Sequence, residues 1–369
     1  MNEIREKFAE IRDERDGSYV KHKLCDILIL VMGAVICGMT ELSEMMEYFE
    51  NKLPFYTTHF GIKKYPSKAT LSRILNMVDP RAVGEVIVQI MLKNTANIGE
   101  IVAIDGKSVR STSIKGKPHS ALQILTAFCT ESGVILGQEP ILHEDKTNEI
   151  PIFQDMLECL DIKGKTITAD AMHCQKETCR KITEKEGFYF FGLKENQKNF
   201  YDDVKLFFES EINDDECEKF ITIEQNGGRI EKRICRKCEN IDWFYEKSEW
   251  YGLKNFVEIT RKITYSDKET VETGYYITSR TASAEEMLKI SREHWKIESM
   301  HWMLDVIWKE DFSGILSDNG NEVLNILRKI ALFAHKKYVK ALPKKRSVKS
   351  NVLSALLNDN VFLDVIGSL

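Results

Sequence analysis

The sequence predicts an α/β protein in which a mixed sheet flanked by helices follows a helical N-terminal region. Residues 1 to about 95 have the composition and capping signals of helices. From residue 99 onward, short apolar and β-branched segments alternate with amphipathic segments of helical length. Residues 200 to about 280 are charged, aromatic and β-branched, which predicts a β-rich insertion. The chain therefore divides into a domain of residues 1–95 and a domain of residues 96–369.

Composition limits the possible classes of protein. The chain has 369 residues, of which 43% are hydrophobic and 30% charged, as is typical of a globular protein of two or three domains. Its net charge of -5 argues against an indiscriminate binder of polyanions. The nine cysteines are scattered, and a reducing cytoplasmic compartment fits this pattern best. The apolar run 27–39 is too short to span a bilayer, so we expect a buried helix and no membrane contact.

The N-terminal region is expected to contain several helices. Thr40 is a candidate cap for the helix after the apolar run, and Ser67 for a short helix that continues to Leu75. Asp79 and Pro80 then mark a break before a further helix. These small helices could contact DNA or could serve only as a packing domain, and the sequence leaves both possibilities open.

The second region has the expected order β-β-β-α-β-α-β. Residues 131–133, Glu-Ser-Gly, suit the turn of a hairpin between the second and third strands. The segments expected to form strands are 100–109, 120–131, 133–142, 165–171 and 188–196, and those expected to form helices are 150–162 and 175–187.

The insertion and the helix after it complete the predicted elements. Residues 226–228, Asn-Gly-Gly, predict a hairpin turn inside the insertion. Residues 285–311 follow as a helix. Its predicted buried face contains Ile297, Met300, Leu304 and Ile307. The opposite face contains Glu298, His301, Trp302, Asp305 and Lys309.

Two aspartates mark a candidate site. Asp105 and Asp170 each follow a short apolar strand, and ligands of open α/β sheets bind at the carboxyl ends of strands. Two carboxylates on neighbouring strands repel each other, and a divalent metal removes that cost. Oxygen ligands favour Mg²⁺ or Mn²⁺, and Glu298 would supply a third oxygen ligand. Two such ions would activate a water or a 3′-hydroxyl and stabilise the leaving oxygen. The alternative for each aspartate is a turn residue or a helix cap.

A basic stretch lies near the C-terminus. No acidic residue occurs between Glu322 and Asp359, and we expect this patch to contact phosphates. The alternative is a solvated basic helix and tail. The nine cations in this window are Arg328, Lys329, Lys336, Lys337, Lys340, Lys344, Lys345, Arg346 and Lys349.

Four motifs resemble those of a known family. They are IVAIDGKSVRST, TADAMHCQKET, FFGLKENQKNFYDDV and REHWKIESMHWMLDVIWKED. In this order they resemble bacterial insertion-sequence DDE transposases of the H-repeat-associated branch. The N-terminal region resembles the domain that precedes the catalytic core in that branch, so the resemblance covers nearly the whole chain.

The resemblance implies an RNase H-like core that cuts and joins DNA at the ends of its element. It implies Mg²⁺, with Mn²⁺ as a substitute, and catalytic roles for Asp105, Asp170 and Glu298. It also implies a homodimer in a synaptic complex on terminal inverted repeats and target DNA, inside the bacterial cytoplasm. Ser299 stands where the family commonly has Asn. Asp305 stands where related enzymes place a Lys, and we expect it to be in a salt bridge rather than a shared ligand.

Further residues are candidates for DNA contact. Cations near the site would bind phosphates, and aromatic side chains beside Glu298 would stack on unpaired bases. Ordinary packing or solvated charge is the alternative for each of them. The candidates are Lys107, Arg110, Lys194, Lys198, Trp295, His301, Trp302, Lys336, Lys337, Lys344, Lys345 and Arg346. Two other functions remain open, a metal-dependent nuclease that does not join strands and a DNA-binding remnant that does not cut.

Overall fold

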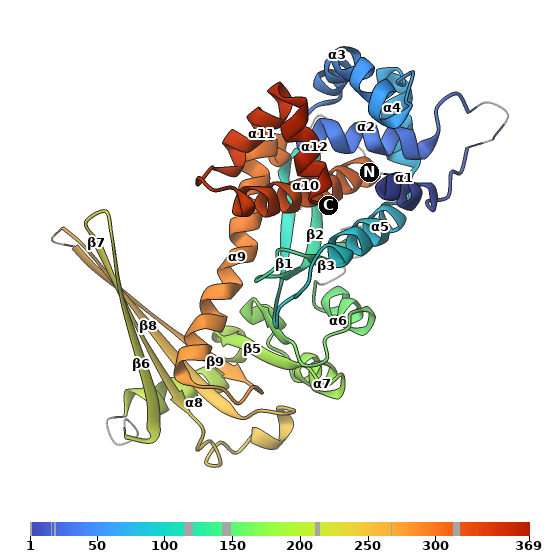
Figure 1. Ribbon diagram of the computed structural model, residues 1–369. Coiled ribbons are helices and arrows are strands. Elements are labelled where there is room, and N and C mark those ends of the chain that lie inside the picture. Colours follow the sequence, from blue (N-terminus) through green and yellow to red (C-terminus); the bar gives the residue numbers. More distant parts are fainter. Residues whose placement is uncertain are drawn as a thin grey trace.

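The computed structural model describes residues 2–369 except 16, 18–19, 114–120, 142–148, 211–214, 267 and 313–317. The first residue of the predicted strand 120–131 and the last of 133–142 lie outside the described residues. Within the described ranges the architecture is a mixed sheet flanked by helices, as the sequence predicts (Figure 1).

The N-terminal region is helical. Ser67 caps α4 by accepting a hydrogen bond from the Thr70 backbone N–H, as expected. The predicted cap at Thr40 is wrong, because Glu41 takes the N-cap position of α3 and forms a capping box with Glu44. Thr40 instead donates from its backbone N–H and its hydroxyl to Glu44. The helices are α1 (Asn2–Ala9), α2 (Leu24–Ile36), α3 (Leu42–Phe60), α4 (Lys68–Met77) and α5 (Pro80–Lys93).

The core has the predicted order of elements. Strand β1 pairs antiparallel with β2 and parallel with β4, and β4 pairs parallel with β5. This is the mixed sheet expected of an RNase H-like core. The strands are β1 (Ile101–Val109), β2 (Leu122–Cys129), β3 (Ile135–Ile141), β4 (Thr166–Ala169) and β5 (Phe188–Leu193), with α6 (Glu149–Cys159) and α7 (Lys176–Glu184) between them.

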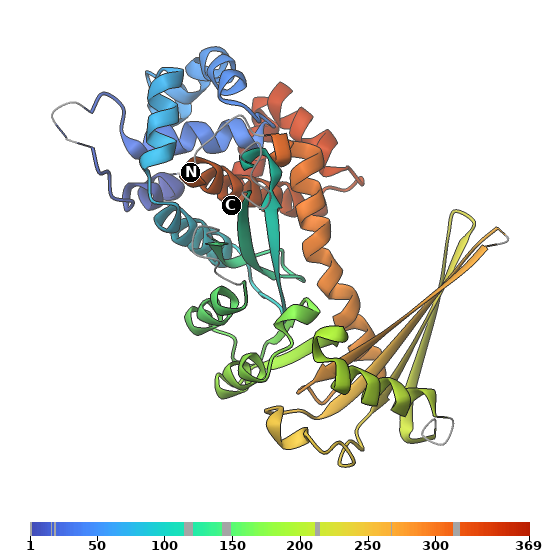
Figure 2. The ribbon, with the colours of Figure 1, turned by 180° about the vertical axis from the view of Figure 1, so that it is seen from behind.

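The insertion extends the core sheet instead of forming a separate unit. Strand β9 pairs antiparallel with β5, so nine strands form one sheet in the order β3-β2-β1-β4-β5-β9-β8-β7-β6. Figures 1 and 2 show that the outer ends of these long strands project away from the rest of the molecule. The elements of the insertion are α8 (Lys198–Glu209), β6 (Cys217–Asn226), β7 (Arg229–Cys238), β8 (Asn255–Tyr265) and β9 (Lys268–Thr278).

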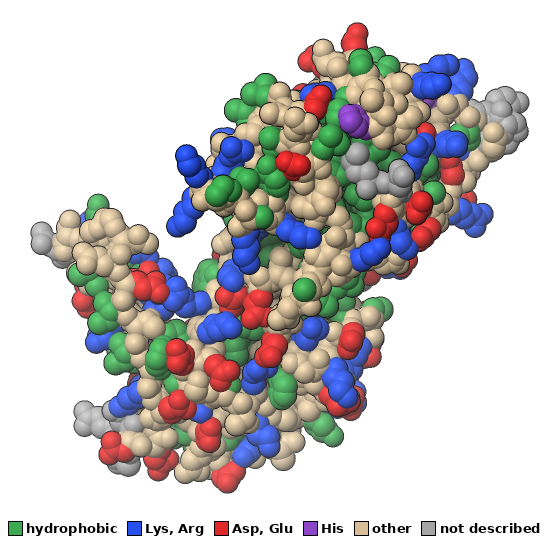
Figure 3. Space-filling model, in the orientation of Figure 1, with side chains coloured by type: hydrophobic (Ala, Val, Ile, Leu, Met, Phe, Trp, Pro, Cys, Tyr) green, Lys and Arg blue, Asp and Glu red, His purple; other side chains and the backbone are tan. Residues whose placement is uncertain are grey.

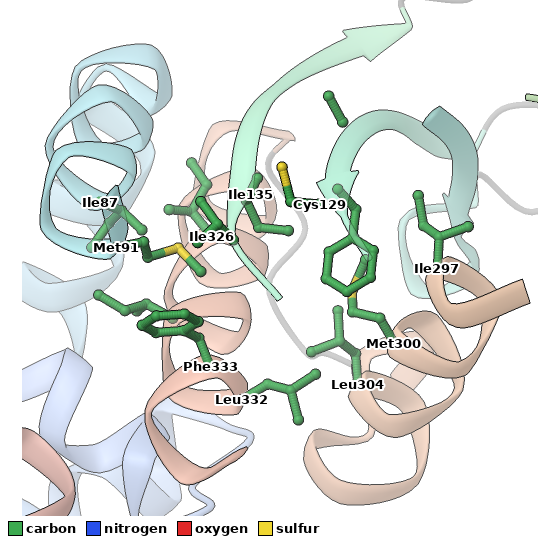
Figure 4. Packing of buried hydrophobic residues seen from close by; sticks show 14 of the residues in the cluster. Ile87, Met91, Cys129, Ile135, Ile297, Met300, Leu304, Ile326, Leu332 and Phe333 are labelled. Atoms are coloured by element: carbon green, nitrogen blue, oxygen red, sulfur yellow. The ribbon is translucent and has the colours of Figure 1, made fainter. Parts of the chain in front are cut away.

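The C-terminal helices join the core to the N-terminal region. Helix α10 (Asp318–Ala341) packs against α2, α4 and α5. The indole N–H of Trp308, at the end of α9 (Ala284–Trp308), donates to the Val35 carbonyl oxygen at 2.6 Å. Figure 4 shows apolar side chains of α5, α9, α10 and the sheet meeting in one cluster. The N-terminal helices therefore share a hydrophobic core with the C-terminal ones, which end in α11 (Val348–Leu357) and α12 (Asp359–Gly367).

Candidate active site

The sheet brings the two aspartates together. Ile104 of β1 lies opposite Ala169 of β4 in a parallel pair, so Asp105 and Asp170 are the next residues on adjacent strands. Asp170 follows the last residue of β4, whereas β1 continues past Asp105 to Val109. Asp105 therefore lies level with the carboxyl end of β4, at the kind of position where ligands of such sheets bind. The Asp105 side chain is partly buried, and that of Asp170 is exposed.

Helix α9 carries Glu298 to the same edge. The helix begins after Ser283, whose hydroxyl accepts from the Glu286 backbone N–H in a capping box. The buried side chains of Ile297, Met300 and Leu304 hold it on the sheet, as the sequence predicts. Burial raises the pKa of Glu298, and the negative charges of Asp105 and Asp170 raise it further. The three carboxylates therefore lie within electrostatic reach of one another.

Two histidines of α9 contact the aspartates. His301 Nδ1 lies 3.3 Å from Asp105 Oδ2, and His294 Nε2 lies 3.8 Å from Asp170 Oδ1. His294 Nδ1 also lies 3.0 Å from the Thr168 hydroxyl. The pKa of Asp170 is lowered, mainly by His294, against the opposing effect of burial. His301 is buried, which does not favour its predicted contact with DNA; that contact stays a prediction.

Lys107 lies two residues after Asp105 on the same face of β1, and its side chain is largely buried. Its ammonium binds Asp305 at 2.6 Å and Glu310 at 2.7 Å, and its side chain is only 12% exposed. The expected contact of Lys107 with a DNA phosphate stays a prediction, and these two ion pairs and the low exposure of the side chain do not favour it. The expectation that Asp305 forms a salt bridge is confirmed. Glu310 lies in the last quoted motif but was not among the predicted site residues, because no local pattern shows that it is buried against Lys107.

Two tryptophans of α9 are exposed beside Glu298. Trp295 is 58% exposed and Trp302 is 62% exposed. They are three residues before and four after Glu298, so they share its face of the helix. Both side chains are therefore accessible next to Glu298, and their contact with DNA stays a prediction.

Lys194 lies close to the site. It lines a hollow of about 570 Å³ together with Asp170, and its charge contributes to the lowered pKa of Asp170. Arg110 is 83% exposed, and Lys198 is exposed and paired with Asp202. These three cations remain candidates for phosphate contact.

The basic stretch at the C-terminus is divided by the fold. Arg328 and Lys329 are buried, which contradicts a continuous patch that contacts phosphates. Lys344, Lys345 and Arg346 are exposed and remain candidates. Lys336 and Lys337 are half-buried and line a separate groove along α9.

The chemistry of the donors fits a divalent ion that prefers oxygen ligands. Asp105, Asp170 and Glu298 offer carboxylate oxygens, and the pKa of Glu298 is raised first by burial and then by the negative charges of the two aspartates, which a cation would offset. Across the described part of the chain, however, no three acidic, histidine or cysteine side chains are arranged to hold one ion. A histidine of α9 instead lies beside each aspartate, at 3.3 Å from Asp105 and 3.8 Å from Asp170.

Comparison with known proteins identifies the family. The sequence model of the family described as "Transposase DDE domain" matches residues 97–334. The chain belongs to the DDE transposase family. The model of the associated N-terminal domain of this family matches residues 5–91.

Curated relatives agree with this assignment to the DDE transposases. YncI of Escherichia coli O157:H7 is 35% identical over 87% of this chain and 84% of its own length. The H repeat-associated protein YhhI of Escherichia coli K12 is 32% identical over 90% of both chains, which confirms the predicted branch.

A solved structure of another transposase resembles the fold. A chain of the piggyBac transposase synaptic complex with hairpin DNA matches with a TM-score of 0.47 and 13% identity, over 98% of this chain and 77% of that one. This likeness is too weak to add to the assignment. In the described residues, no helix is long and apolar enough to cross a membrane.

Proposed function

We propose that this DDE transposase cuts DNA at the ends of its insertion element and joins the cut ends to target DNA. The reaction would depend on divalent ions held by Asp105, Asp170 and Glu298, with Mg²⁺ as the normal ion and Mn²⁺ as a substitute. The observation that supports the proposal is the convergence of these three carboxylates at one sheet edge, in a chain of this family. When bound, the ions would activate the attacking oxygen and stabilise the leaving one.

The residues of the chain itself would position the DNA and the carboxylates. His301 and His294 hold Asp105 and Asp170 from the side of α9. Trp295 and Trp302 offer faces on which unpaired bases at a cut end would stack. Lys194 would contact a phosphate beside Asp170. We further propose that the enzyme works in the cytoplasm as a homodimer that brings two terminal repeats together.

The test is cleavage of a labelled duplex that carries the terminal repeats of the element, in Mg²⁺, Mn²⁺ or EDTA. Asp105→Asn and Glu298→Gln should each lower the cleavage rate by at least about 10³-fold, because each removes a ligand of the reaction centre. DNA binding should stay near the wild-type level, since neither residue is a cation.

Glu285→Gln is the matched control, because Glu285 is an exposed carboxylate in the first turn of the same helix. It should cleave normally. Full cleavage by Asp105→Asn or Glu298→Gln would overturn the site assignment. Cleavage without strand joining would indicate a nuclease, and binding without cleavage would indicate a DNA-binding remnant.

A further inference from the structure

A lysine groove lies along α9 beside Lys296, Ser299 and Met303. Its volume is about 580 Å³, and its floor includes the turn 130–133 and the segment 94–97. Four lysines line it, which are Lys296 of α9 and Lys336, Lys337 and Lys340 of α10. In the view of Figure 3, Lys and Arg side chains gather over the region where Figure 1 places α9 and α10. Lys296 is about 40 positions before the three lysines of α10 in the sequence, and only the packing of the two helices brings it close to them.

The positive charge of the groove is not neutralised within the described part of the chain. Among the described residues, neither Lys336 nor Lys340 forms an ion pair with a carboxylate. In the same residues, Lys337 donates to the carbonyl oxygens of Asn94 and Ser368 and not to a carboxylate. Burial lowers the pKa of Lys336, and the nearby charge of Lys296 lowers it further. The fold therefore accepts a repulsive arrangement that a bound anion would relieve.

The single acidic residue lining the groove does not cancel this charge. Glu131 accepts a hydrogen bond from the Glu100 backbone N–H at 2.6 Å and pairs with Lys289 at 3.4 Å. Lys296 pairs with Glu293 at 2.6 Å, so the lysines of α10 carry the net excess.

The groove adjoins the candidate active site. Lys296 and Ser299 line it, and they are two residues before and one after Glu298. Because a helix is about 10 Å across, a DNA strand with one phosphate at Glu298 would reach the groove within a few nucleotides of that phosphate. Phosphates a few nucleotides away from the reacting one are therefore the anions that this position favours.

We infer that the lysine groove binds the phosphate backbone of DNA on one side of the cleavage position. The inference rests on the proposed function, because it takes DNA as the ligand. It adds Lys296 and Lys340 to the predicted DNA contacts and gives Lys336 and Lys337 a defined place. The contact would fix the register of the DNA without reading its sequence, as phosphate contacts generally do.

The test measures binding of the full-length protein to the terminal-repeat duplex in EDTA, over a range of salt concentrations. Lys336→Ala and Lys340→Ala should each weaken binding several-fold and reduce the slope of log K against log salt by about one. The double variant should reduce the slope by about two. Lys163→Ala is the control, because Lys163 is an exposed lysine near the opposite end of β4 from Asp170, and it should bind as the wild type does.

Shortening the duplex locates the contact. The wild type should lose affinity when the DNA segment that occupies the groove is trimmed from one end. The double variant should show no further loss on the same trimming, because it no longer contacts that segment. Equal losses in both proteins would overturn the inference.

Two further outcomes separate the possible failures. A wild type that binds and cleaves, with unchanged salt slopes in the variants, would overturn the groove inference alone. A wild type that neither binds nor cleaves would overturn the proposed function as well. Stabilisation of the wild type by inorganic phosphate, with no effect of the variants on DNA binding, would make the groove a site for a free anion and would overturn the assignment to DNA.

Discussion

The buried ion network around Glu310, which includes Lys107 and Arg328, leads to a quantitative prediction about stability. The Glu310 carboxylate is fully buried and contacts Lys107 at 2.7 Å, Asn325 at 2.8 Å and Arg328 at 3.5 Å. Lys107 of β1 also binds Asp305 of α9, and Asn325 and Arg328 belong to α10, so the network joins β1, α9 and α10. We expect Glu310→Gln to destabilise the protein strongly, because it leaves the buried Arg328 without its carboxylate and removes one of the two carboxylates that bind Lys107.

The magnitude follows from the charges. Lys107 and Arg328 lower the pKa of Glu310 from 4.5 to about 2, in spite of its burial. This difference corresponds to about 3 kcal/mol in the free energy of unfolding at pH 7. The usual cost of removing one partner of a buried pair is about 3–5 kcal/mol, which agrees. The pKa of Arg328 is lowered, because the effect of burial is larger than the opposing effect of the Glu310 charge.

The dependence on pH has a definite sign. The folded pKa is below the unfolded one, so the stabilisation is complete above pH 4.5 and is lost as the pH falls towards 2. The difference between wild type and Glu310→Gln should therefore shrink from about 3 kcal/mol at pH 7 to about 2 kcal/mol at pH 3.5.

The assay is denaturant unfolding, with Asp311→Asn as the control. Asp311 is the next residue, and it pairs with the exposed Arg110 at 3.6 Å. Its loss should cost no more than about 1 kcal/mol. A Glu310→Gln variant as stable as Asp311→Asn at pH 7 would refute the reasoning.

The remaining predictions concern single side chains of the shared core and of α9. Trp308→Ala should cost about 3–5 kcal/mol in thermal or denaturant unfolding, because Trp308 is fully buried and donates to Val35. Trp302→Ala should change stability by less than about 0.5 kcal/mol but weaken binding of DNA with unpaired ends, and unchanged binding would contradict a stacking role. Burial lowers the pKa of His335 to about 4, so the unfolded chain binds an extra proton below pH 6.5 and stability should fall by about 2 kcal/mol at pH 5. His335→Gln should remove that part of the pH dependence, and an unchanged pH profile would contradict it.

Local patterns in the sequence were sufficient for most elements. The apolar run 27–39, the cap at Ser67 and the alternating segments from residue 99 each gave the correct kind of element. Hydrophobic periodicity also gave the buried face of α9 correctly. These features depend on neighbours within a few positions, which the sequence displays directly. The cap at Thr40 was wrong because the capping box of Glu41 and Glu44 competes for the same position.

The sequence by itself determined the family motifs and the three carboxylates of the candidate site. Their convergence depends on the register of β1 with β4 and on the path of α9, which only the tertiary structure decided. The same holds for the cations, because the sequence shows their charge but not their burial. Lys107, Arg328 and Lys329 are inside the protein, whereas Lys296 joins Lys336 and Lys340 in a groove. Whether a cation faces a phosphate or a buried carboxylate depends on contacts between residues far apart in the chain, which no local pattern records.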